Sequence, residues 1–168
     1  MPLDSGIAQA AELGGFFAAH SLWCVSDGET LIPLVGHEGK DGKRNLTRLV
    51  TEDLDEGVEQ GKAMLVANPD KAQRAVLVFD GFLTLGEVRK DALFVTFVDY
   101  TAKARVSVEL AVPYRSKEDK AGFAVHRPKF IELGRIEDLA ALSEAFFRGV
   151  EAHEEGSKVW TKFLDQSF

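Results

Sequence analysis

The sequence predicts a single α+β domain: an antiparallel sheet of about five to seven strands, two main helices packed on one face, and an N-terminal helix. A length of 168 residues is usual for one domain with one core, so residues 1–168 are expected to fold together. The composition, 45% hydrophobic and 28% charged, is that of a globular protein. Apolar residues recur at helical spacing near both ends of the chain, and apolar and polar residues alternate over a long stretch between them. This pattern favours helices that cover an antiparallel sheet.

The first segment predicts a helix that ends near His20. Asp4 or Ser5 can cap it, and apolar residues recur at helical spacing over residues 7–17. Gly14 and Gly15 interrupt this pattern, and each costs a helix about 1 kcal/mol relative to alanine. We therefore expect either a break or a close packing contact at the two glycines.

A hairpin is predicted after this helix. Residues 21–26 and 30–35 read as extended runs, and Asp27-Gly28 between them supplies the positive φ angles of a tight turn. Glycine and charged residues dominate residues 36–43, which predicts a loop, and residues 44–50 then add a short strand.

The second helix is predicted to begin at Thr51 and to end at Asn68-Pro69. Threonine is a favourable N-cap, and the acidic residues that follow it complement the positive end of the helix dipole. Its buried stripe repeats at helical spacing and consists of Leu54, Val58, Met64 and Leu65.

The main sheet is predicted from residues 73–80, 92–100, 104–112 and 122–133, in which apolar residues recur with period two. An antiparallel meander is the simplest way to connect them, with Asp80-Gly81 as a turn. Pro128 cannot donate to a strand ladder, so the last strand should lie at an edge or be interrupted there.

A third helix over residues 135–153 is predicted to cover the sheet with its apolar stripe. Residues 157–168 form an aromatic C-terminal tail in which Trp160, Phe163 and Phe168 either seal the domain or bind a partner. We expect these three residues to contribute to a protein interface, including one between two copies of this chain.

Charge and hydropathy limit the partners of the chain. A net charge of -7 opposes binding to nucleic acid, because phosphate recognition needs a clustered positive surface. No signal sequence and no long apolar run occur, so we expect a soluble cytoplasmic protein without a membrane segment. The single cysteine, Cys24, cannot form an internal disulfide and is expected to be a small core residue.

Local motifs for catalysis, cofactors or metals do not match. The glycines of residues 36–44 have the wrong spacing for a Walker loop, and no Ser or Thr follows Lys43. The four histidines lie far apart in sequence, and no serine stands in a nucleophile elbow. We therefore assign no catalytic, cofactor-binding or metal-binding residue, and an enzymatic activity is not favoured.

Two functional hypotheses follow from the sequence. The first is a non-enzymatic binding or protein-interaction module that self-associates. The second is a small-molecule-binding protein or enzyme with a pocket between the sheet and the helices. Such a pocket would draw on polar residues that are distant in sequence, for which Asp99, Tyr114, His126 and Arg127 are the candidates.

Overall fold

The computed structural model describes residues 3–168, so the first two residues of the predicted domain lie outside the described part. The helices are α1 (Ser5–Ser26), α2 (Leu54–Ala67), α3 (Leu139–Ala152) and α4 (Glu154–Lys162). The strands are β1 (Leu34–Glu38), β2 (Arg44–Arg48), β3 (Arg74–Leu85), β4 (Val88–Asp99), β5 (Val106–Arg115), β6 (Ala124–Val125) and β7 (Lys129–Glu132). They form one antiparallel sheet in the order β2-β1-β3-β4-β5-β6, with β7 also paired to β5. The predicted α+β class with an antiparallel sheet is confirmed.

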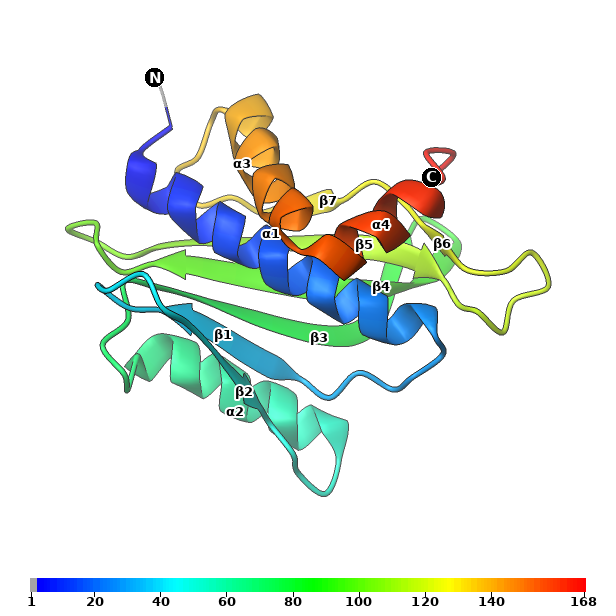
Figure 1. Cartoon of the computed structure of the whole chain (residues 1–168), viewed down its shortest axis with the longest axis horizontal. Helices are drawn as coiled ribbons and strands as arrows, with labels where there is room; N and C mark the ends of the chain where they lie inside the picture. The colour runs from blue at the N-terminus through cyan, green and yellow to red at the C-terminus, as the bar shows by residue number, and fades with distance from the viewer. Residues whose placement is uncertain (1–2) are drawn as a thin grey trace.

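The helices lie on both faces of the sheet (Figure 1). On one face, α1 packs across β3 and β4, and α3 and α4 pack against α1. On the other face, α2 covers β1 and β3 through Leu65 and its neighbours. The two main helices, predicted on one face, are therefore divided between the two faces, and the N-terminal helix takes the central position.

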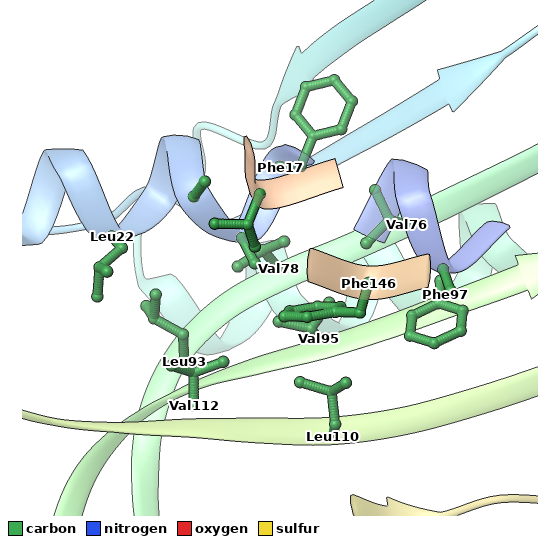
Figure 2. Close-up of a cluster of buried hydrophobic side chains, with 14 of the residues drawn as sticks. Phe17, Leu22, Val76, Val78, Leu93, Val95, Phe97, Leu110, Val112 and Phe146 are labelled. Carbon is green, nitrogen blue, oxygen red and sulfur yellow. The ribbon is translucent and has the colours of Figure 1, made fainter. Parts of the chain in front are cut away.

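The main core lies between α1, α3 and the sheet. Alternate residues of β3, β4 and β5 point into it, and Figure 2 shows Val95 and Leu110 beside Phe146 of α3; Val76 and Phe17 of α1 belong to the same buried cluster. All five are at most 4% exposed. Burial of this continuous apolar surface is the main favourable term that holds the helices on the sheet.

Glycines set the distance between α1 and its two neighbouring helices. A Cβ atom added to Gly15 would overlap the backbone carbonyl of Phe146, and one added to Gly149 would overlap that of Glu12. Gly156 of α4 faces the backbone of Ala19 in the same way. The close contact expected at Gly14 and Gly15 is thus present, and α1 continues through both without a break.

The predicted hairpin at Asp27-Gly28 is wrong. Residues 21–26 are helical, and Gly28, with φ of 84°, follows the last turn of α1, where its backbone N–H donates to the carbonyl of Val25. Gly at the end of a helix and Gly in a hairpin need the same positive φ, so the dipeptide alone did not distinguish them. Leu22 and Val25 are buried in the core, and this burial favours the helix over the hairpin.

Asp80-Gly81 is also not a turn. Both residues lie inside β3, which pairs with β4 in continuous register from Arg74 to Leu85. The reversal falls at Gly86 instead, which has φ of 61°. The interruption predicted at Pro128 is present: it lies between β6 and β7, which pair separately with β5.

Candidate functional site

Of the four polar residues considered for a pocket, Asp99 lies apart from the other three, because Tyr114 pairs with Val125, which directly precedes His126 and Arg127. Asp99 pairs with Val106, whereas Tyr114 pairs with Asp91 eight residues away along β4, so Asp99 and Tyr114 lie toward opposite ends of the β4–β5 pair. The buried Asp99 carboxylate accepts hydrogen bonds from the backbone N–H and the hydroxyl of Thr101, at 2.8 and 2.6 Å. This residue therefore orders the turn after β4.

Tyr114 is buried and donates its hydroxyl hydrogen bond to the carboxylate of Asp80, 2.8 Å from each oxygen. Partial burial raises the pKa of Asp80, the hydrogen bond from Tyr114 lowers it, and the nearby Asp91 raises it. Burial and the Asp80 charge raise the pKa of Tyr114 far above its usual range. The phenol therefore stays protonated and acts as a hydrogen-bond donor.

His126 and Phe168 fasten the C-terminal tail to the sheet edge. The His126 Nδ1–H donates to the backbone carbonyl of Asp165 at 2.9 Å, and its ring lies 5.5 Å from that of Phe168. The ammonium groups of Lys90 and Lys129 lie 4.8 and 5.0 Å from the centroid of the Phe168 ring. The buried Nε2 of His126 has no hydrogen-bond partner among residues 3–168.

The other two aromatic residues of the tail also contact their own domain. Trp160 is 4% exposed and packs edge-on against Phe147, with ring centroids 5.5 Å apart. Phe163 packs edge-on against Phe123 at the same centroid distance of 5.5 Å. Each of the three tail rings therefore has an intramolecular contact. The protein interface predicted at Trp160, Phe163 and Phe168 stays a prediction.

Arg127 and Trp160 meet at a cavity of about 450 Å³. Its walls come from α3, α4, the β6–β7 link and the tail that follows α4. The lining is mostly apolar and includes Pro128, Phe147, Val150, Trp160 and Leu164. Ser143, Ser157, Thr161 and Gln166 add neutral polar groups, and Arg127 and Glu151 are the charged residues of the lining.

The polar groups of this cavity have unused hydrogen-bonding capacity. Within residues 3–168, no carboxylate lies within 4.0 Å of the exposed guanidinium of Arg127. The buried indole Nε1 of Trp160 likewise has no acceptor among the described residues. An apolar concave surface with a few unsatisfied polar groups is the usual composition of a small-molecule site.

A second cluster joins His20 and Cys24 of α1 to His153, the residue between α3 and α4. The Nδ1 atom of His20 lies 3.3 Å from Nε2 of His153, and Nε2 of His20 lies 4.0 Å from the Cys24 sulfur. His153 Nδ1 accepts a 2.9 Å hydrogen bond from the backbone N–H of Gly156. Cys24 is half-buried and borders a small hollow of about 110 Å³, rather than lying wholly in the core as predicted.

The hydrogen bonds of this cluster determine where its protons lie. Because His153 accepts at Nδ1, its neutral ring carries the proton on Nε2 and donates it to Nδ1 of His20. His20 then carries its own proton on Nε2, facing the Cys24 sulfur. His20 in this state cannot remove the thiol proton, and burial raises the pKa of Cys24, so the cluster is not organised as a nucleophile with its general base.

Sequence reasoning named Arg127 for a pocket and Trp160 for a protein interface, but it did not predict the cavity or the His20–His153 pair. Ser143 and Glu151 reach the cavity from α3, and their helical pattern carries no sign of it. His20 and His153 are separated by 133 residues, so no local spacing could pair them.

No family model, curated protein or solved structure matches the chain. The described residues contain no group of three or more His, Cys, Asp or Glu side chains placed to hold a metal ion. None of the helices in the described part is both long and apolar enough to cross a membrane. The cavity and the histidine cluster are two features of the described residues from which a function can be inferred.

Proposed function

We propose that this protein binds a small molecule with an apolar body and an acidic group in the cavity between α3, α4 and the β6–β7 link. The observation that carries the proposal is an apolar hollow of about 450 Å³ whose lining includes Arg127, a residue with no ion pair among residues 3–168. Known ligand sites fall between about 300 and 1,000 Å³ and combine apolar walls with a few polar groups.

The apolar part of the ligand would pack against Phe147, Val150, Trp160 and Leu164. Burial of these surfaces together supplies affinity in proportion to the apolar area removed from water. The hydroxyls of Ser143 and Thr161 offer hydrogen bonds to polar substituents.

Arg127 supports an acidic rather than a basic group on the ligand. A guanidinium can donate two parallel hydrogen bonds to a carboxylate, and its rigid fork makes this geometry specific. Glu151 lines the same cavity and would repel a second acidic group. A single carboxylate on an apolar chain therefore fits the lining better than a polyanion.

Calorimetric titration at pH 7.5 with octanoate and with 1-octanol tests the proposal. We expect octanoate to bind more tightly than octanol, and Arg127→Gln to weaken octanoate binding about tenfold, because a hydrogen bond to a charged group contributes about 1.5–3 kcal/mol. Octanol binding should change little in this variant.

Arg135→Gln is the matched control, because Arg135 is also exposed but does not line the cavity. It removes the same charge and should leave both affinities unchanged. Equal binding of octanoate by the wild type and by Arg127→Gln would contradict the proposal, as would failure of both probes to bind the wild type.

A further inference from the structure

His153 links the ends of two helices to α1. Its backbone ends α3 and begins α4, and its Nδ1 caps α4 by accepting from the N–H of Gly156. Its Nε2 meets Nδ1 of His20 on α1, and its ring lies near those of Phe16 and Trp23, at centroid distances of 5.0 and 5.9 Å. The His153 imidazole therefore caps the N-terminal turn of α4, which also packs through Gly156 against Ala19 of α1.

Gly156, His153 and His20 form a series of two hydrogen bonds. Neither histidine can accept a proton without breaking one of them. In the neutral state, the N–H of Gly156 donates to His153, and His153 donates to His20. If His153 is protonated, both of its nitrogens become donors and the cap on Gly156 is lost. If His20 is protonated at Nδ1, two N–H groups face each other and the bond between the histidines is lost. His153 can restore that bond only by moving its proton from Nε2 to Nδ1, which removes the cap on Gly156.

We propose that protonation of the His20–His153 pair releases the N-terminal turn of α4 and thereby weakens ligand binding in the cavity. The coupling follows from position, because α4 contributes Ser157, Trp160 and Thr161 to the cavity, and Glu151 lies two residues before His153. The ligand part of this inference rests on the proposed function, whereas the movement of α4 does not.

Burial favours the neutral state of both histidines. Burial lowers the pKa of His20, and His153 and the Arg48 side chain of β2 lower it further. Burial also lowers the pKa of His153, whereas the negative charge of Glu155 on α4 acts to raise that pKa. Glu29, from the link after α1, borders the same small hollow as His20 and Cys24.

The sign of the pH effect follows from these directions. A histidine whose pKa is lowered in the closed state binds protons more readily once α4 has opened. The closed state is therefore fully favoured above the ordinary histidine value of 6.5, and this advantage is lost as the pH falls below that value.

Backbone hydrogen exchange measured by NMR at pH 7.5 and 5.0 tests the conformational step. After correction for the intrinsic exchange rate, we expect protection of Gly156 and the following amides of α4 to fall about tenfold at pH 5.0, because a helix loses its N-cap. In His153→Asn, the amide oxygen can cap the helix without titrating, so protection should be the same at both pH values. His37→Gln is the control, because His37 lies on β1 near Asp70, and it should behave as the wild type.

Titration with 1-octanesulfonate, which stays charged at both pH values, tests the coupling. We expect about tenfold weaker binding to the wild type at pH 5.0 and no change for His153→Asn. Unchanged α4 protection in the wild type, or an equal loss in His153→Asn, overturns the proposed switch. If α4 opens as expected but octanesulfonate does not bind at pH 7.5, the proposed function fails and only the conformational step is supported.

Discussion

The contact between α1 and α3 depends on two residues without side chains. Gly15 and Gly149 let the backbone of each helix approach the other more closely than any Cβ atom would permit. On the sequence, Gly14 and Gly15 appear as defects in a helix, because glycine is a poor helix former. Their cost is offset here by the contact that they allow, and Arg148 and Glu12 join the same helices beside it with a 2.8 Å ion pair.

Gly149→Ala is expected to lower the free energy of unfolding by about 2 kcal/mol. Overpacking typically costs about 1–3 kcal/mol, and here it outweighs the gain of about 1 kcal/mol in helix propensity because the obstacle is backbone. Urea denaturation measures the change. Glu144→Ala, at an exposed position of the same helix, should change stability by less than about 0.5 kcal/mol. An alanine at position 149 without cost would contradict the close contact.

The hydrogen bond between Tyr114 and Asp80 gives a second prediction at this scale. Because this bond lowers the pKa of Asp80, Tyr114→Phe should raise that pKa further. NMR titration of the Asp80 carboxyl carbon measures the pKa of Asp80 directly. An unchanged or lower Asp80 pKa in the variant would show that the bond does not operate in solution.

At the scale of elements, local sequence predicted where helices and strands occur better than where they end. The second helix was expected to begin at Thr51, but the residue that caps it is Asp53, whose carboxylate accepts from the N–H of Glu56 at 2.8 Å. Asp27-Gly28 and Asp80-Gly81 both suit turns, yet one follows a helix and the other lies within a strand. Such boundaries depend on contacts with distant residues, which a short window of sequence does not contain.

Asp53→Ala should therefore destabilise the protein by about 1 kcal/mol through loss of the N-cap of α2. Thermal or urea denaturation measures this effect. Glu59→Ala is the control, because it removes an acidic residue from the exposed face of the same helix and breaks only a surface pair with Lys62. If Asp53→Ala costs no more than Glu59→Ala, the carboxylate of Asp53 does not cap α2 in solution.

At the scale of the whole molecule, the class and the sheet were predictable because alternation and helical spacing are repeated over many residues. The candidate site was predictable only in part. Arg127 and Trp160 stood out by type, whereas Asp99 belongs to another end of the sheet. The His20–His153 pair exists only because α1 and the α3–α4 junction meet in space, so it depends on the finished fold.

The central position of α1 also affects how the chain reaches that fold. This helix contacts β3 and β4, and then α3 and α4, whose residues lie more than a hundred positions further along the chain. A high average sequence separation between contacting residues slows folding, because the loops must close before their contacts form. Until the strands have paired, the apolar face of α1 that includes Ile7, Leu13 and Leu22 has no surface to cover it. The interval between synthesis of α1 and completion of α3 is therefore when the chain is most exposed to aggregation and most dependent on chaperones.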